Sequence, residues 1–217
     1  MKNYIVKNSF ILLGLLLLVS CDLTDDYKGS DDLVTVERDL GSFQNIIAQD
    51  GMTVNVSQGE AQQVLVTTNA NLTENLITRV ENNTLKIDLK NGAYRSTTFI
   101  LDIQVPDLNR LRFEDAVDGE LFMISDEITI EMEDASKLDL RGNADVLTIE
   151  MSDASKVYGF DFMANTVNVR SQDASKLEIT VMDLLHGKAT DGSKIMYKGN
   201  PSINVSTEDA AKVINEN

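Results

Sequence analysis

The tetrapeptide Asp134-Ala135-Ser136-Lys137 occurs again unchanged at residues 153–156 and 173–176. Altered copies are Asp191-Gly192-Ser193-Lys194 and Asp209-Ala210-Ala211-Lys212, and Asp115-Ala116 is a weaker first member. Successive aspartates lie 19, 19, 20, 18 and 18 residues apart. A nearly constant period of this length is typical of stacked-repeat proteins, in which each repeat packs mainly on its two neighbours.

Residues at fixed distances from each aspartate alternate between apolar and polar. The position four residues before the aspartate holds Leu111, Ile130, Ile149, Val169, Gly187 and Val205, and the position four residues after it holds Gly119, Leu138, Val157, Leu177, Ile195 and Val213. The position six residues before it holds Ile128, Leu147, Val167, Leu185 and Ile203 in the five clear copies. Polar residues such as Thr129 and Glu131 lie between them. A period of two is the pattern of a strand, whereas a helix would repeat every 3.6 residues.

Each repeat therefore predicts a strand, a tight Asp-Ala-Ser turn, a second strand and a second turn, which Arg141-Gly142-Asn143 marks in one copy. One such unit cannot bury its apolar face alone, but stacked copies can. We predict an all-β fold: a right-handed parallel β-helix (β-solenoid) with 18–20 residue coils, flattened into two facing sheets. The aspartate carboxylate is expected to accept the N–H group two residues further on, as in an Asx-turn. Stacking would place Asp over Asp and Lys over Lys, and the lysine column is expected to offset the repulsion between aspartates.

The first twenty residues predict a signal peptide rather than a part of the fold. Lys2 and Lys7 precede the apolar run 10–19, which is too short for a permanent membrane-spanning helix. Leu18-Val19-Ser20-Cys21 resembles the bacterial lipobox, in which the cysteine is acylated and becomes the new N-terminus. The chain contains one cysteine, so no disulfide competes with this role. We predict a lipoprotein signal peptide at 1–20 and lipidation of Cys21, with an ordinary cleaved leader as the alternative.

The sequence after the predicted anchor divides into a tether and one domain. Residues 21–32 are acidic and polar and are expected to form a flexible tether. Residues 33–217 are expected to form a single β-helix domain, with irregular opening coils at 33–110 and the Asp-Ala-Ser-Lys coils at 111–217. No linker rich in proline, glycine or serine separates these two parts.

The 217-residue chain contains 19 Lys and Arg against 35 Asp and Glu, which gives a formal net charge of −16. A protein of this charge is not expected to bind nucleic acid or anionic lipid through its overall electrostatic field. The predicted contact with the membrane is therefore the N-terminal lipid anchor alone.

Few residues are suited to catalysis. His186, the one histidine, falls on an outward strand position and is expected to be an exposed surface residue. Glu131 and Glu150 beside Arg170 could imitate the metal ligands and base of a lyase, and the aspartate column could bind calcium between coils. Solvated and turn-capping roles are favoured for these residues. We predict no cofactor, no metal, no catalytic residue and no enzyme activity.

One apolar cluster could serve a partner. Phe160, Phe162 and Met163 lie at one second turn, and Tyr158 and Met196 lie on outward strand positions nearby. They could form a small exposed patch. Packing of the bend on its neighbour is the favoured alternative.

Several segments resemble the family of the putative auto-transporter adhesin, head GIN domain. They are Phe43-Gln44-Asn45-Ile46, Gly51-Met52-Thr53-Val54-Asn55-Val56 with Gln58-Gly59, Asn83-Thr84-Leu85-Lys86-Ile87, Ile103-Gln104-Val105-Pro106-Asp107-Leu108 and the repeats. The resemblance covers about residues 40 to 215, but Asp-Ala-Ser-Lys stands where the family usually has glycine- and serine-rich turns. It implies a bacterial lipoprotein with a right-handed β-helix shaped like a pectin lyase, without the catalytic residues of those enzymes.

The combined expectation is a non-catalytic, lipid-anchored protein of the bacterial cell envelope, in the outer membrane and facing the periplasm or the surface. Its rigid acidic solenoid would serve adhesion or partner binding, with a surface protein or a glycan as the partner. The alternative is a polysaccharide-binding or polysaccharide-processing protein that uses one solenoid face. A homo-oligomer formed through the exposed ends or faces is a further possibility.

Overall fold

The computed structural model describes residues 25–217, so the predicted signal peptide and Cys21 lie outside the described residues. The described chain is built almost entirely of strands, with one short 3-10 turn at Ala70–Leu72. The strands up to the first repeat are β1 (Asp26–Lys28), β2 (Leu33–Glu37), β3 (Asn45–Ala48), β4 (Thr53–Gln58), β5 (Gln63–Asn69), β6 (Leu76–Glu81), β7 (Thr84–Leu89), β8 (Ala93–Arg95), β9 (Phe99–Val105) and β10 (Arg110–Phe113). The repeat strands are β11 (Asp118–Met132), β12 (Lys137–Met151), β13 (Lys156–Ser171), β14 (Lys176–Ala189), β15 (Lys194–Lys198), β16 (Ser202–Thr207) and β17 (Lys212–Asn215).

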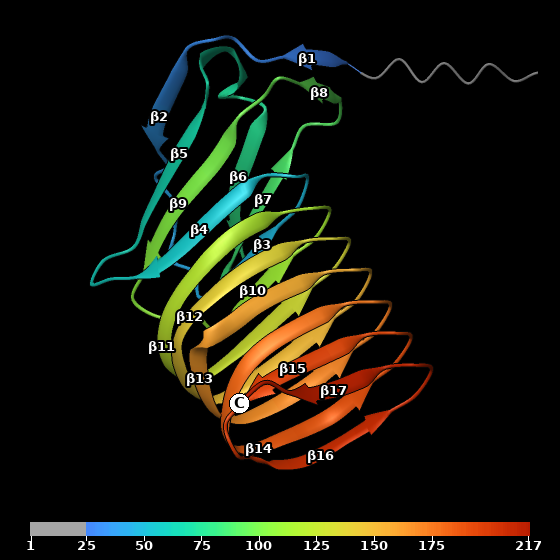
Figure 1. Cartoon of the computed structure of the whole chain (residues 1–217). Helices are drawn as coiled ribbons and strands as arrows, with labels where there is room; N and C mark the ends of the chain where they lie inside the picture. Colours follow the sequence, from blue (N-terminus) through green and yellow to red (C-terminus); the bar gives the residue numbers. More distant parts are fainter. Residues whose placement is uncertain (1–24) are drawn as a thin grey trace, which may run out of the picture.

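The repeats stack as parallel coils, which confirms the predicted β-solenoid (Figure 1). Leu138 of β12 pairs with Val157 of β13, and Ile149 pairs with Val169. The sequence analysis had placed the two residues of each pair at equivalent positions, four residues after or before a repeat aspartate. The sequence period therefore equals one turn of the solenoid.

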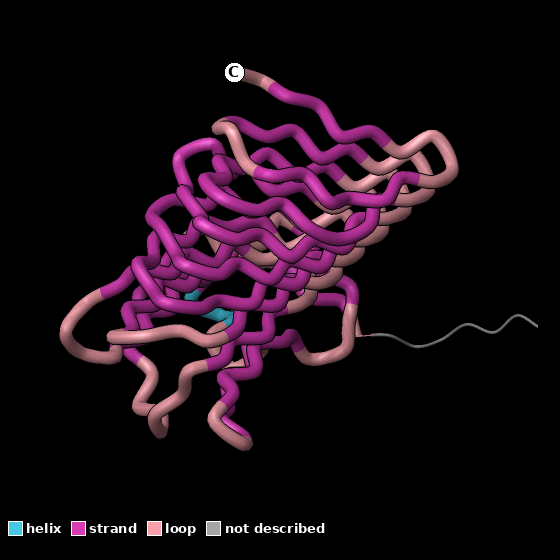
Figure 2. The backbone as a smooth tube through the Cα atoms, turned by 90° about the horizontal axis from the view of Figure 1, so that it is seen from below, coloured by secondary structure: helices cyan, strands magenta, loops and turns pink. Residues whose placement is uncertain are grey.

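Each coil contributes to two facing layers, which we call sheet 1 and sheet 2. Sheet 1 contains the segment that follows each Asp-Ala-Ser turn, together with β15 and β17. Sheet 2 contains the segment that precedes each turn, together with β10 and β16. The two layers meet at stacked tight turns on one side and at a rounded bend on the other (Figure 2).

The rounded bend differs from the predicted second turn. In β11 to β14 the strand continues through the bend, where the inter-coil pairing is regular between β11 and β12 and shifts register between β12 and β13 and between β13 and β14. Gly142 shows how closely the coils approach, since a Cβ on this residue would lie 1.9 Å from the carbonyl oxygen of Met123. Its φ of 118° also disfavours any residue with a side chain.

The segment before the repeats is more complex than the expected opening coils. β3 and β4 do form a coil that pairs with β10 and β11 in parallel. The segment between β4 and β10 instead extends both sheets with antiparallel neighbours, in which β5 pairs with β9 and β6 pairs with β7. β2 closes the edge beside β5. Residues 33–110 thus contain one regular coil, interrupted by an insertion that widens this end.

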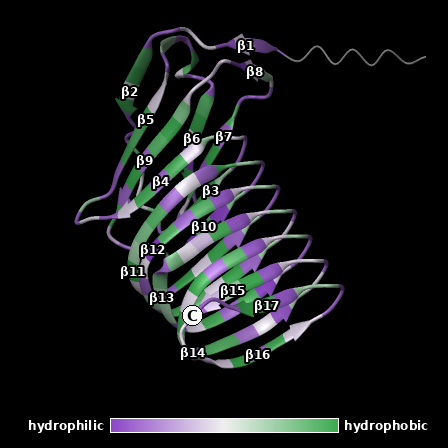
Figure 3. Cartoon of the chain, in the orientation of Figure 1, coloured by the Kyte–Doolittle hydropathy of each residue, from purple (hydrophilic) through white to green (hydrophobic). Residues whose placement is uncertain are grey.

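The apolar columns form the interior, and one hydrophobic cluster runs from Phe43 to Ile195. Apolar and polar residues alternate along the strands of both sheets (Figure 3). Gly119 occupies a column that elsewhere holds Leu, Val or Ile. A Cβ there would lie 2.1 Å from the Val54 carbonyl oxygen and 2.9 Å from the Phe113 ring. The glycine therefore makes room for a large buried ring on the facing sheet.

The expectation of a flexible tether across residues 21–32 is wrong from residue 26 onward. β1 pairs in parallel with β8, and the Tyr27 ring stacks on Tyr94 with their centroids 5.1 Å apart. The Asn69 side chain donates to the Ser30 carbonyl oxygen at 2.7 Å. Composition predicted a tether because the contacts that order this stretch come from residues far along the chain. Within residues 25–217 no helix has the length and apolar character needed to cross a membrane.

Candidate binding surfaces

The tight corners form a single row of two-residue turns. In each turn the Asp and the following Ala or Gly have positive φ, for example 51° at Asp134 and 61° at Ala135. The Ser136 N–H donates to the Glu133 carbonyl oxygen at 3.1 Å and closes the turn. These features are those of a type I′ turn, which favours Asp, Asn and Gly because they tolerate the left-handed region.

The Asx-turn prediction for the aspartates is wrong. The N–H group that was to bond the carboxylate, that of Ser136, is already bonded to the backbone, and the Ala135 N–H donates to the Asp153 carbonyl oxygen at 2.8 Å. The same link joins Ala154 to Asp173 and Ala174 to Asp191. The repeat aspartates are exposed. Backbone hydrogen bonds therefore link one corner to the next, while the carboxylates face solvent.

One corner was missed from the sequence. Asp50-Gly51 has the same positive φ values, and the Gly51 N–H donates to the Asp115 carbonyl oxygen at 2.8 Å. Its signal was present, because Ile46 and Val54 lie four residues to either side. The insertion between β4 and β10 separates Asp50 from Asp115 and hides the period.

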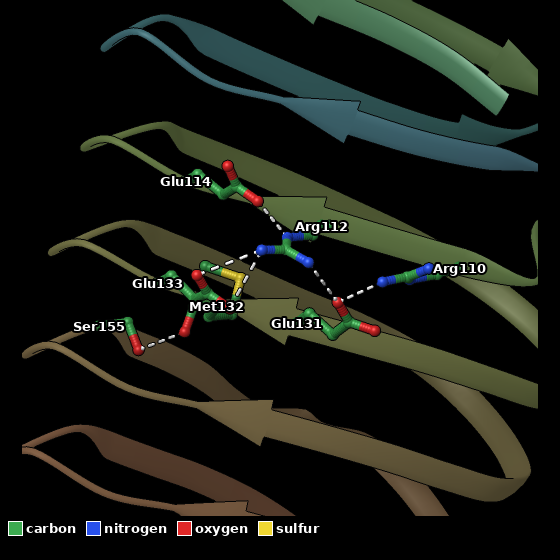
Figure 4. A network of polar contacts seen from close by, with 7 residues as sticks. All are labelled: Arg110, Arg112, Glu114, Glu131, Met132, Glu133 and Ser155. Carbon is green, nitrogen blue, oxygen red and sulfur yellow. Dashed lines mark hydrogen bonds and ion pairs between the residues drawn. The ribbon is translucent and has the colours of Figure 1, made fainter. Parts of the chain in front are cut away.

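The serines of the repeats form an internal row that the sequence reasoning did not assign. Ser136, Ser155, Ser175 and Ser193 are buried. The Ser155 hydroxyl donates to the Met132 carbonyl oxygen at 3.1 Å, and Ser193 donates to Ser171 at 2.9 Å (Figure 4 shows the Ser155 contact). The alternation of side chains along a strand could have predicted this row. The serine two residues after the aspartate lies on the same face as the buried apolar residue four after the aspartate.

The acidic residues considered for lyase-like chemistry belong to an ion-pair network (Figure 4). Glu131 accepts from Arg110 at 2.5 Å and from Arg112 at 3.4 Å. Arg112 also pairs with Glu114 and, at 3.3 Å, with Glu133. Burial acts to lower the pKa of Arg112, but the three carboxylates outweigh it and raise that pKa above its ordinary value. Glu131 is thus committed to two arginines.

The remaining candidates for chemistry stand apart. Glu150 and Arg170 lie next to Glu131 in register, but both are exposed and neither makes an ion pair within the described chain. His186 pairs with Asn168 and Asn204 on the outer surface of sheet 2 and is exposed, as predicted. Within residues 25–217 no group of three or more His, Cys, Asp or Glu side chains is placed to hold a metal ion.

The proposed apolar patch is only partly formed. Phe162 is fully buried, and the Phe160 ring is covered by the Lys198 ammonium group 4.4 Å from its centroid. Met163 and Tyr158 remain exposed. The bend therefore packs mainly on the adjacent parts of the solenoid, which was the favoured alternative to an exposed patch.

A groove of about 300 Å³ lies on the outer surface of sheet 1, where parallel strands β11, β12 and β4 meet β9 and β5. Its polar and aromatic lining includes Asn55, Asp102, Glu120, Phe122, Asp139 and Arg141. The Phe122 ring is 47% exposed. Asn55 donates to Asp102 at 2.9 Å, and Arg141 pairs with Glu120 at 3.3 Å, so four of the polar groups are held in place around the ring.

The lysines of the repeats form a second outward feature of sheet 1. Lys137, Lys156, Lys176, Lys194 and Lys212 pair one with the next in unbroken register. We call this the lysine row. It was expected to offset the charge of the corner aspartates, but no ion pair joins it to Asp134, Asp153, Asp173, Asp191 or Asp209 among the described residues.

Comparison with known proteins agrees with this architecture. A crystal structure titled as a putative adhesin from Bacteroides fragilis is 17% identical, with a TM-score of 0.68 over 87% of this chain and 99% of that one. Another titled as a putative adhesin, from Parabacteroides merdae, is 15% identical with a TM-score of 0.57 over 89% and 100%. A third, titled as a putative lipid binding protein from Parabacteroides distasonis, is 16% identical with a TM-score of 0.58 over 89% and 100%. At these identities the likeness concerns the fold alone.

None of the curated proteins matches the chain. A family described as "Putative auto-transporter adhesin, head GIN domain" matches residues 42–201. This range begins just before β3 and includes the regular coil, the insertion and four repeat coils, so the match rests on most of the solenoid. The chain belongs to that family of adhesin-like proteins.

Proposed function

We propose that the chain is a non-catalytic protein of the bacterial cell envelope, anchored to the outer membrane through acylated Cys21, whose solenoid presents a rigid acidic surface for adhesion or partner binding. The observation that carries this proposal is the register of β11 to β17, in which equivalent positions of successive coils pair with one another outside the bend, where β13 is shifted against β12 and β14. It places outward side chains in straight columns at ~4.8 Å intervals. Such a surface suits an extended partner with its own repeat rather than a small substrate.

The anchor is tested with Cys21→Ala in the full-length chain. The variant should move from the membrane fraction to the soluble fraction, because acyl chains would be the only attachment. Ser30→Ala, a small change outside the lipobox, is the control and should stay with the membrane. Retention of the Cys21→Ala variant in the membrane fraction would contradict lipidation.

The adhesive role is tested by deleting the gene for the chain and measuring the attachment of the cells to protein-coated and polysaccharide-coated surfaces and to other cells. Loss of attachment, restored by the wild-type chain but not by Cys21→Ala, is the expected result. Attachment that is unchanged by the deletion would refute the role.

A second candidate function is polysaccharide binding at the groove on sheet 1. The exposed Phe122 ring offers an apolar face, and the fixed amide, carboxylate and guanidinium groups around it can donate and accept hydrogen bonds. This is the combination that a sugar ring, with apolar faces and hydroxyl edges, requires.

Phe122→Ala tests the groove, and Ile124→Ala is the matched control because Ile124 is 50% exposed but does not line the groove. On an array of neutral glycans, Phe122→Ala should lose at least about tenfold in affinity for any glycan that the wild type binds, whereas Ile124→Ala should not. Equal binding by both variants would exclude the groove, and release of reducing ends from a bound glycan would show processing rather than binding.

A further inference from the structure

We propose that the lysine row binds a linear acidic polysaccharide that carries one carboxylate on each sugar. The row runs from Lys137 to Lys212 parallel to the solenoid axis, and the inference rests on the proposed binding function because it names the partner of the solenoid surface. Strand spacing sets the Cα atoms of successive lysines ~4.8 Å apart, so the five residues span ~19 Å.

Three of the five ammonium groups of the lysine row are available to a ligand. Lys137 pairs with Asp118 at 3.2 Å, and Lys176 pairs with Glu178 at 2.6 Å. Lys156, Lys194 and Lys212 make no ion pair within residues 25–217. A row of like charges at this spacing repels itself, and a polymer with matching negative charges would relieve that repulsion.

The neighbouring column supports a sugar polymer rather than a bare polyanion. Two residues after the lysines, on the same outward side of β13, β15 and β17, lie Tyr158, Met196 and Ile214. Asp139 of β12 and Glu178 of β14 are the two acids of this column, and Glu178 is already paired with Lys176. The Tyr158 ring is 38% exposed and has the Lys176 ammonium group 5.7 Å from its centroid, so rings of a pyranose chain would lie over the exposed part of Tyr158 and over Met196 with their carboxylates directed at the lysines.

Nucleic acid fits this surface poorly. Single strands bind through successive aromatic platforms, and this stretch offers only Tyr158. The formal charge of −16 and the exposed aspartates at the corner also oppose a densely charged polymer. A polymer with one carboxylate on each sugar also carries one full charge on each unit, so the preference for a sugar polymer rests on the missing aromatic platforms rather than on charge density.

The experiment compares the full-length protein in detergent with a triple variant of the unpaired lysines, Lys156→Gln, Lys194→Gln and Lys212→Gln. The control triple variant is Lys28→Gln, Lys90→Gln and Lys188→Gln, which removes the same charge from other surfaces. Binding to polygalacturonate is measured by titration calorimetry at low and high salt, with the fully methyl-esterified polymer as the uncharged ligand control.

The wild type and the control triple variant should bind the acidic polymer, and the row variant should bind at least about tenfold more weakly. Binding should weaken as salt rises and should be absent for the esterified polymer and for the single sugar acid. Equal losses in both triple variants, or no binding by the wild type, would overturn the proposal. Equal or tighter binding of single-stranded DNA would overturn the choice of a polysaccharide.

A structural role for the row predicts something else. If the lysines mainly compensated the corner aspartates, the row variant would be less stable than the wild type in urea, whereas a binding row predicts equal or higher stability. Failure of the polymer to bind, in cells that still lose attachment when the chain is deleted, would remove the lysine row as the site and leave the adhesive function standing.

Discussion

The alanines of the corners lie in a backbone region that suits glycine better. Ala135, Ala154 and Ala174 have φ between 58° and 61°, where the Cβ of an L-residue crowds the following carbonyl oxygen. Gly51 and Gly192 show that the same corner accepts glycine. Inter-coil hydrogen bonds keep the alanines there, so each corner retains a local cost that packing outweighs.

Ala154→Gly should therefore raise the free energy of unfolding by about 0.5–1 kcal/mol, since relief of left-handed strain exceeds the extra entropy of the unfolded chain. Ala164→Gly is the matched control. Ala164 is fully buried in β13 without positive φ, so the same change there should lower stability by about 0.5–1 kcal/mol. Urea unfolding measures both. A loss at both sites would refute strain at the corner.

Glu131 and Glu150 occupy the same column one coil apart, but their surroundings differ. Glu131 is paired with Arg110 and Arg112 and is 16% exposed, whereas Glu150 is exposed without an ion pair in the described chain. Glu131→Gln should cost about 1–2 kcal/mol of unfolding free energy, because two partly buried guanidinium groups lose their shared carboxylate. Glu150→Gln should change it by less than about 0.5 kcal/mol. Equal effects in chemical denaturation would show that the network contributes nothing.

At the scale of strands, the sequence predicts what repeats and misses what does not. The inward columns, the sheets and the register of β11 to β17 followed from the spacing of the aspartates, because each coil meets nearly the same neighbours. The insertion between β4 and β10 has no repeated copy. Its antiparallel pairs depend on which strands meet in space, which alternation within one strand cannot reveal.

The binding surfaces follow the same division. The lysine row was predicted as a column, because it comes from repeated positions. The groove was not predicted, since Phe122 and Asp102 are far apart in sequence and approach only when β9 and β11 flank β4. The aspartates were predicted to form Asx-turns because Asp is favoured in both an Asx-turn and a type I′ turn. Only the φ values of the Asp and the residue after it distinguish the two turns.

The last coil depends on its edge contacts. Ile203 of β16 lies in a column that is fully buried in the coils before it, but here it is 44% exposed. The Asn217 side chain accepts from the Gly199 N–H and donates to the Gly199 carbonyl oxygen, both at 2.7 Å, as a neighbouring strand would. These two hydrogen bonds satisfy the N–H and carbonyl groups of Gly199, which would be unpaired at an open sheet edge.

Asn217→Ala should loosen this coil without unfolding the solenoid. Hydrogen exchange at the Gly199 amide should become at least about tenfold faster, while the amide of Ile149 in β12 should be unchanged. Asn217→Asp, which keeps the acceptor but loses the donor, should have an intermediate effect. Unchanged exchange at Gly199 in the alanine variant would show that the side-chain contact adds no protection.

At the scale of the whole molecule, the solenoid resembles a one-dimensional stack in which each coil touches only its neighbours. β12 packs on β11 and β13, and the outward columns run straight past it. Its removal should therefore shorten the molecule without changing its cross-section. Binding to a long polymer should then weaken with the number of lysines removed, whereas the groove, which includes Asp139 and Arg141 of β12, should be altered more strongly.

Deletion of residues 137–155 tests this view, because it joins Ser136 to Lys156 and restores an intact Asp-Ala-Ser-Lys corner. The shortened chain should fold with the same far-ultraviolet spectrum per residue, and its unfolding free energy and urea m-value should both fall, since less surface is buried. Deletion of residues 137–146 is the control.

This deletion removes the sheet 1 half of one coil, so that a strand of sheet 2 follows the corner in the place of a strand of sheet 1. The shortened chain should therefore not unfold in a cooperative transition. If the full-period deletion also failed to fold, coils would not be interchangeable units, and the straight column on which the lysine row depends would need contacts beyond nearest neighbours.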